Sequence, residues 1–312
     1  MPIACKLEVV RLENDMKKSL FVKRAQLVSL INLIAQSGII VTGAVVRLTG
    51  SGLGCPTWPN CAPGSLVPVA SQVEGFHKYI EFGNRLLTFV VLFASVALLI
   101  TAVISKVKKL IIWSALPLLG TLLQAILGGI TVLTGLNPFT VMSHFLLSMI
   151  LVAISTLIYR FWSKDKPLKI NSSIIRNYIK FFTLSGFIVI ILGTITTGSG
   201  PHSGDEIAAR FNIDTRTIAW IHADSVLLFI GLLVGLIILV RTNKELNSLT
   251  RPLNSLIILC LIQGLIGYTQ WFTNLPWILV GFHVLGSVLI WINLMLIFEK
   301  SINSLKNSIK QI

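Results

Sequence analysis

Charged residues are scarce in this chain. Asp, Glu, Lys and Arg together make up 12% of its 312 residues, which is roughly half the ~25% share of an ordinary soluble domain. Acidic residues are rarer than basic ones, with 12 Asp and Glu against 26 Lys and Arg. There are only four cysteines. With 54% hydrophobic residues and a mean hydropathy of +0.83, a water-soluble globular enzyme is excluded. The composition predicts a polytopic helical membrane protein.

The chain also lacks the short motifs of several enzyme classes. It has no Walker or dinucleotide-type glycine pattern, no zinc-type spacing of Cys and His, and no nucleophile elbow. The first 25 residues lack the pattern of a cleaved signal peptide. A net charge of +14 could suggest nucleic acid, but the basic residues cluster between apolar runs. We therefore expect a lipid bilayer as the partner, and no nucleic acid.

Apolar runs of about 20 residues, the length that crosses ~30 Å of hydrocarbon, recur along the chain. They predict eight transmembrane helices at residues 26–47, 82–105, 110–133, 139–162, 178–198, 217–241, 252–273 and 275–298. With the N-terminus inside, 21 of the 26 Lys and Arg fall in cytoplasmic segments. The positive-inside rule therefore predicts that both termini face the cytoplasm.

The sequence contains an internal repeat. Residues 124–148 align without gaps on residues 263–287, with eight of 25 positions identical. We therefore expect an all-α membrane protein built as two pseudo-symmetric four-helix bundles. The predicted parts are a cytoplasmic tail at 1–25, a bundle at 26–162, a cytoplasmic linker at 163–177, a second bundle at 178–298 and a cytoplasmic tail at 299–312.

Three of the five histidines, His144, His222 and His283, fall inside predicted spans, each about five to eight residues from the outer end. The helical rise places all three at a similar depth. A single histidine in a span more commonly joins two helices by a hydrogen bond. Two imidazoles at one depth on facing helices, however, are a standard way to hold a haem iron. We predict haem ligation for these three, and expect His77 and His202, in outer loops, to be surface residues.

One position breaks the repeat. Aligning the starts of the second and sixth spans sets Asn84 opposite His222, and asparagine is a poor iron ligand. The sequence thus predicts one saturated site suited to electron transfer and one site with an open or weakly held iron position. Glu81, one turn above Asn84, either complements the helix end or serves proton delivery. Arg85 either binds a haem propionate or extends to lipid phosphates.

Cys55 and Cys61 flank a Pro-Thr-Trp-Pro-Asn segment in the first outer loop. The space outside a bacterial-type membrane permits disulfides, and two cysteines six apart close a small loop. A structural disulfide and a redox-active pair are the two alternatives. Cys5 and Cys260 are expected to be inert.

These features together resemble a known family. The duplicated eight-span plan, the outer loop Thr-Gly-Ser-Gly-Leu-Gly-Cys-Pro-Thr-Trp-Pro-Asn-Cys, the Glu-Phe-Gly-Asn-Arg at residues 81–85 and the repeated Gln and His blocks resemble haem A synthase of the actinobacterial type, over about residues 26–298. The resemblance implies oxidation of the C8 methyl of haem O to a formyl group by successive hydroxylations, giving haem A for cytochrome oxidase. It also implies a multi-pass protein of the bacterial cell membrane. Haem O synthase is then a candidate partner, beside an electron donor that the sequence does not identify.

The resemblance assigns roles residue by residue. It implies that His222 and His283 ligate a haem b cofactor, that His144 faces the substrate haem O, and that Glu81 is the functionally important carboxylate. The two outer-loop cysteines match a pair in the family.

The chain departs from the family in two places. Many members have histidine where Asn84 stands, so the substrate iron is held by His144 alone, by Asn84 through water, or by His77. Many also carry a second cysteine pair, whereas residues 199–216 contain no cysteine. The alternative function is a di-haem electron carrier of the cytochrome b type acting with quinone, against which Asn84 argues. A transporter is a third, disfavoured because the polar groups lie near one surface.

Overall fold

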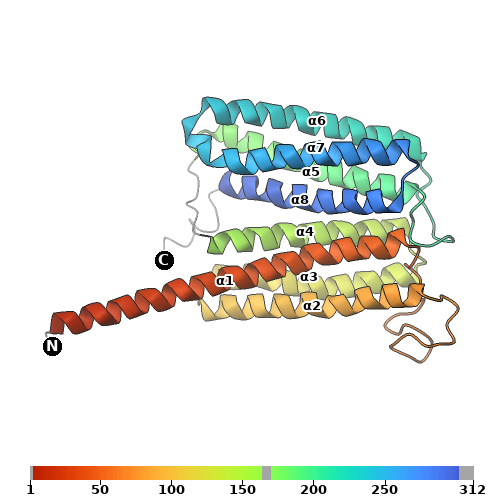
Figure 1. Ribbon diagram of the computed structural model, residues 1–312, viewed down its shortest axis with the longest axis horizontal. Coiled ribbons are helices and arrows are strands. Elements are labelled where there is room, and N and C mark those ends of the chain that lie inside the picture. The colour runs from red at the N-terminus through yellow and green to blue at the C-terminus, as the bar shows by residue number, and fades with distance from the viewer. Residues whose placement is uncertain (1–2, 164–169, 302–312) are drawn as a thin grey trace.

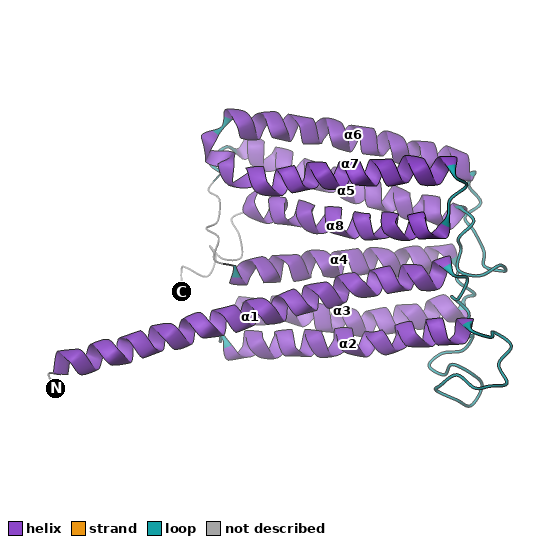
Figure 2. Cartoon of the chain, viewed as in Figure 1, coloured by secondary structure: helices purple, strands orange, loops and turns teal. Residues whose placement is uncertain are grey.

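The computed structural model describes the backbone of residues 3–163 and 170–301, and the side chains of residues 19–163 and 170–300. Figures 1 and 2 show the described part as long, roughly parallel helices joined by loops. The elements in chain order are α1 (Ile3–Leu48), α2 (His77–Ile104), α3 (Lys108–Leu133), α4 (Pro138–Trp162), α5 (Ser173–Ser199), α6 (Thr215–Thr242), the short 3-10 helix η1 (Lys244–Leu249), α7 (Thr250–Phe272) and α8 (Trp277–Ser301).

Within the described residues, eight helices are long and apolar enough to cross a membrane. In α1 this part is Ser19–Leu48, and in the seventh span it runs from Lys244 to Phe272. Helices satisfy their backbone hydrogen bonds internally, which is what a chain in hydrocarbon requires. The prediction of an all-helical, multi-pass membrane protein with eight spans is confirmed.

The helices lie in two neighbouring groups, α1–α4 and α5–α8, and α4 and α8 lie between them (Figure 1). Across this boundary Trp291 Nε1 donates to the backbone carbonyl of Met149 at 2.8 Å, and Arg160 and Glu299 form an ion pair at 3.4 Å. One apolar core joins residues of both groups, among them Leu33 with Leu294. The two groups therefore pack as one body.

The N-terminal segment is more regular than expected. Residues 3–25, predicted only as a tail, continue helix α1, which projects beyond the other helices in Figure 1. This stretch contains neither Pro nor Gly, so nothing in it breaks a helix. Residues 164–169 of the predicted linker and 302–312 of the predicted C-terminal tail lie outside the described residues.

Four connections gather at one end of the molecule, here named the loop end, while the two termini lie at the other, the terminal end (Figure 1). Two of the four are tight hairpins, in which Leu136 and then Asn274 and Leu275 adopt left-handed φ values near 60°. The other two are the long loops that follow α1 and α5. Every candidate residue named above lies in the loop-end half of its helix or in these loops.

Candidate functional site

The three histidines inside spans lie on α4, α6 and α8, in the loop-end half of each helix. All three side chains are half-buried. The Nδ1 atoms of His144, His222 and His283 are buried, and no hydrogen-bond partner reaches them from the part of the chain that the structure describes. A buried polar atom without a partner is costly, so each of these rings is suited to a ligand.

Each imidazole faces a glycine on a neighbouring helix. A Cβ built on the glycine would lie 3.3 Å from Cε1 for Gly128 and His144, 3.1 Å for Gly193 and His222, and 3.4 Å for Gly267 and His283. Real side chains rarely approach this closely, so a larger residue would push the ring. The absence of a Cβ thus gives each ring its position.

A fourth glycine also lies against a polar side chain on the next helix, but that side chain is an amide instead of an imidazole. Gly43 on α1 faces Asn84 on α2, and a Cβ on the glycine would lie 3.9 Å from Nδ2. The Asn84 Oδ1 accepts a hydrogen bond from Thr42 Oγ1 at 2.7 Å. Asn84 therefore lies against its glycine as His222 does, which supports the alignment of these two positions.

Two of the histidines belong to the same group of helices. His222 lies on α6 and His283 on α8. His144 lies in the other group of helices, on the same group as Asn84. The arrangement supports one site with two imidazoles and one site with a single imidazole and an amide.

A glutamine supports the helix backbone at two of the histidines. Gln124 Nε2 donates to the carbonyl oxygen of His144 at 2.9 Å, and Gln263 Nε2 donates to that of His283 at 2.8 Å. The Oε1 atom of each glutamine is buried with no partner among the described residues. The glutamines repeated in the sequence thus have the same contact in both halves.

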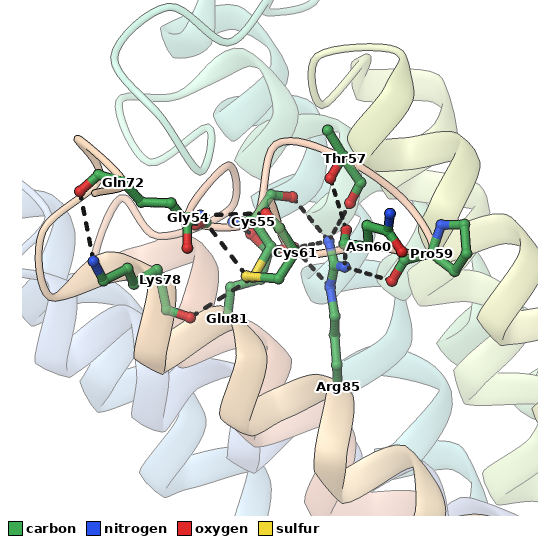
Figure 3. A network of polar contacts seen from close by, with 10 residues as sticks. All are labelled: Gly54, Cys55, Thr57, Pro59, Asn60, Cys61, Gln72, Lys78, Glu81 and Arg85. Atoms are coloured by element: carbon green, nitrogen blue, oxygen red, sulfur yellow. Dashed lines mark hydrogen bonds and ion pairs between the residues drawn. A yellow bond between two sulfur atoms is a disulfide. The ribbon is translucent and has the colours of Figure 1, made fainter. Parts of the chain in front are cut away.

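The first outer loop is closed by a disulfide between Cys55 and Cys61, with a Cα–Cα distance of 4.3 Å. Glu81 is 6% exposed and lies beneath this loop. Its Oε2 accepts a hydrogen bond from the backbone N–H of Cys55 at 2.6 Å, and its Oε1 accepts from Arg85 Nη2 at 2.7 Å (Figure 3). The carboxylate therefore bonds to the loop and to Arg85 rather than to the first turn of α2.

Arg85 is the main anchor of this loop. Besides Glu81, its guanidinium donates to the backbone carbonyls of Cys55 (2.8 Å), Thr57 (3.0 Å), Pro59 (3.5 Å) and Asn60 (3.1 Å), as Figure 3 shows. These contacts occupy the N–H donors of its planar guanidinium group. The expected contact with a propionate stays a prediction, and it would require Arg85 to release loop carbonyls.

The tip of the same loop covers the first group of helices at its loop end. The Trp58 ring packs on Gly129 of α3, where a Cβ would lie 2.5 Å from Trp58 Cδ2. Gly129 directly follows Gly128, the glycine that faces His144. Glu81, Arg85 and Trp58 thus hold the disulfide loop above the His144 site.

The two remaining histidines make polar contacts at the loop end, and His77, expected in the outer loop, is the first residue of α2. His77 is exposed, and its Nδ1 shares a hydrogen bond with Ser51 Oγ at 2.8 Å. His202 Nε2 contacts the carbonyl oxygen of Leu275 at 2.8 Å. Arg47 donates to the carbonyl of His202 at 2.6 Å and so joins the first span to the second long loop.

Sequence reasoning missed a buried set of side chains that we name the α1–α4 polar network. Its members lie on all four helices of the first group, and each is at most 4% exposed: Asn32, Gln36, Ser95, Thr121 and Ser155. The signal that could have found it is the i, i+4 pair of amides, Asn32 and Gln36, inside an otherwise apolar span.

Comparison with known proteins agrees with this geometry. Residues 26–295 match the sequence profile of the COX15-CtaA family, described as cytochrome oxidase assembly proteins. A protein of Geobacillus kaustophilus named "Heme A synthase" is 34% identical over 108 residues, which are 34% of this chain and 32% of that protein. The "Heme A synthase" of Staphylococcus epidermidis is 26% identical over 262 residues, 78% of this chain and 84% of that protein.

A third relative, the "Heme A synthase" of Shewanella oneidensis, is 29% identical over 195 residues, 55% of each chain. The alignments thus span between about a third and four fifths of these proteins, and the first covers only about a third. The family profile covers nearly all of the eight spans. The chain therefore belongs to the COX15-CtaA family of cytochrome oxidase assembly proteins.

Proposed function

We propose that this protein is a haem A synthase, an oxidoreductase that converts the C8 methyl of haem O to a formyl group and so provides haem A for cytochrome oxidase. The observation that carries the proposal is the unequal pair of sites. The α5–α8 group has two imidazoles that each lie against a glycine, and the α1–α4 group has one such imidazole and an amide. Family membership and relatives named "Heme A synthase" support it.

The site on α6 and α8 fits a resident haem b. His222 and His283 would hold its iron, since each is an imidazole on a helix of this group with a ring nitrogen that has no partner among the described residues. When bound, the haem groups supply electron transfer and oxygen activation. Gly193 and Gly267 keep the two imidazoles in place by leaving room beside each ring.

The site on α2 and α4 fits the substrate. His144 would bind the iron of haem O, and Asn84, whose amide is a weak iron ligand, would leave an iron position open for reaction. The disulfide loop, with Trp58 on Gly129, excludes bulk water from the loop end of this site. The protein therefore positions the substrate and restricts the access of water and protons to it.

Glu81 is the titratable group placed to handle protons here. It lies one turn from Asn84 on α2, and Arg85 and the Cys55 amide orient its two oxygens. We assign to it the holding and release of a proton at Oε2 or Oε1 beside the reacting methyl. Arg85 then acts chiefly as the residue that positions Glu81 and the loop.

The same proposal includes the location and partners of the protein. The loop end, which carries the disulfide, faces outward from a bacterial cell membrane, and the two termini face the cytoplasm, as the distribution of Lys and Arg predicts. Haem O arrives from haem O synthase, and an electron donor reduces the resident haem b.

The test is extraction of the haems from the purified protein after expression with a source of haem O, followed by chromatography and mass analysis. Haem b together with haem A, or with its hydroxylated precursor, is the expected result. Two haem b per chain without any modified haem would instead establish the di-haem electron carrier and remove the synthase.

A further inference from the structure

The α1–α4 polar network forms one continuous hydrogen-bonded chain beneath the His144 site. Asn32 Nδ2 donates to Ser155 Oγ at 3.0 Å, and Ser95 Oγ donates to Asn32 Oδ1 at 3.0 Å. Gln36 Nε2 donates to Ser95 Oγ at 3.4 Å and to Thr121 Oγ1 at 3.1 Å. Gln36 and Thr121 form the upper part of the chain, nearest to the site.

The other group of helices has no such polar chain at the matching positions. Positions are matched by counting along each helix from the glycine or the site residue that faces it. At seven residues from this reference, the second group has Gly186 and Cys260 where the first has Gln36 and Thr121. At eleven residues, it has Phe182, Leu233 and Leu294 where the first has Asn32, Ser95 and Ser155. Phe182, Leu233 and Leu294 belong to the apolar core. Helix packing does not require polar side chains at these levels, because apolar core residues occupy three of the matched positions in the other group.

The directions of these hydrogen bonds fix the orientation of the Gln36 amide. The hydroxyl proton of Ser95 goes to Asn32 Oδ1, and that of Thr121 goes to the carbonyl of Pro117 at 2.7 Å. Both hydroxyl oxygens can then only accept, so they require the NH2 group of Gln36. The network thus uses Gln36 as a donor and leaves its Oε1 as an acceptor.

The substrate and the resident haem differ in one polar group on the matching edge. Haem O carries a hydroxyalkyl substituent on the edge of the ring away from the propionates, where haem b has an apolar vinyl group. If the propionates face the polar loop end, this edge points toward the membrane interior. Gln36 lies seven residues, about 10 Å, below the level of Gly43, a separation that spans the distance from the iron to a substituent of the ring edge together with a hydrogen bond.

We propose that Gln36, held by Thr121 and Ser95, accepts a hydrogen bond from the hydroxyl of the haem O side chain and so distinguishes substrate haem O from haem b. Asn32 and Ser155 are positioning residues, because their hydrogen bonds fix which groups of the network donate and which accept. This inference rests on the proposed function and names the specificity of its substrate site.

The test is binding of haem O and of haem b to the purified protein with its resident haem in place. Quenching of the fluorescence of the seven tryptophans reports binding of added haem. The variants are Gln36→Leu and Thr121→Val, and Cys260→Val in the second group is the matched control. Haem b lacks the hydroxyl, so it controls for any general change in the fold of the site.

We expect Gln36→Leu to weaken haem O binding roughly 3- to 10-fold, the net effect of one hydrogen bond, and to change haem b binding less than about twofold. Thr121→Val should act in the same direction more weakly, and Cys260→Val should leave the ratio of the two affinities unchanged. Equal loss for both haems, or no change for either, would overturn hydroxyl recognition. If the unaltered protein neither binds haem O nor forms haem A, the proposed function itself fails.

Discussion

Gly193 on α5 lies against the imidazole of His222 on α6 so closely that a Cβ on the glycine would be 3.1 Å from Cε1. Glycines contact the imidazoles of His144 and His283 in the same way, on other pairs of helices. The position of each ring is therefore set by the helix beside it as well as by its own. Helix pairs, rather than single helices, are the units that build these sites.

Replacing Gly193 by Ala should displace the His222 ring and weaken binding of haem b. Overpacking of this kind costs about 1–3 kcal/mol, which corresponds to roughly a 5- to 150-fold loss of affinity. Haem b content per chain and its absorption spectrum are the measurements. Gly231→Ala on α6 is the control, because no atom lies within 4 Å of a Cβ there; an equal loss in that variant would refute the packing argument.

Removal of single histidines should separate the two sites. His222→Ala and His283→Ala each remove one side of the two-imidazole site, so the protein as purified should lose its haem b spectrum. His144→Ala should keep that spectrum and lose binding of added haem O, because His144 lies in the other group of helices. Loss of the resident spectrum in all three variants would contradict the assignment of separate sites.

Glu81 should be required for conversion and not for the resident haem. We expect Glu81→Gln to lower formation of haem A by at least about 100-fold, the usual contribution of a proton-transferring group. The amide oxygen can still accept the hydrogen bond from Cys55, and Arg85 keeps its bonds to the loop carbonyls although it loses its carboxylate partner. The haem b spectrum, which we assign to the other group of helices, should be preserved. Product yield is measured by mass analysis of extracted haems, and an unchanged yield would remove the proton role of Glu81.

Loss of the disulfide should loosen the loop that Arg85 and Glu81 hold. Cross-linking a loop of this length stabilises the folded state by about 2 kcal/mol in the chain-entropy treatment. Cys55→Ser with Cys61→Ser should therefore lower Tm and open the loop to added protease. Cys260→Ser, a free cysteine on α7, is the control. An unchanged protease pattern in the double variant would show that the contacts of Arg85, Glu81 and Trp58 hold the loop without the disulfide.

Asp214 caps the first turn of α6, and we expect its contribution to the stability of the fold to depend on pH. The hydroxyl and backbone N–H of Thr217 donate to its carboxylate at 2.7 and 2.8 Å, which holds the pKa of Asp214 below its ordinary value. A lowered pKa in the folded state stabilises the fold above the unfolded pKa, and this gain is lost as pH falls through the folded value. The Tm difference between the native protein and Asp214→Asn should therefore shrink below about pH 4, and a constant difference would contradict it.

The spans followed from the sequence because hydrocarbon imposes a length and a composition on every crossing helix. Three histidines at one depth were visible for the same reason: a polar group in an apolar run stands out, and the helical rise converts its position into depth. The repeat of Gln124 and His144 in Gln263 and His283 placed the two sites in corresponding parts of the chain.

The sequence by itself thus determined the number of spans, the depth of the histidines and the asparagine at the position that aligns with His222. Only the tertiary structure decided which side chains meet. It turned Arg85 toward the disulfide loop, placed Glu81 under Cys55, and joined Asn32 and Gln36 to serines and a threonine on three other helices. Spacing along one helix fixes which face a residue occupies, whereas its partners depend on how four helices pack around it.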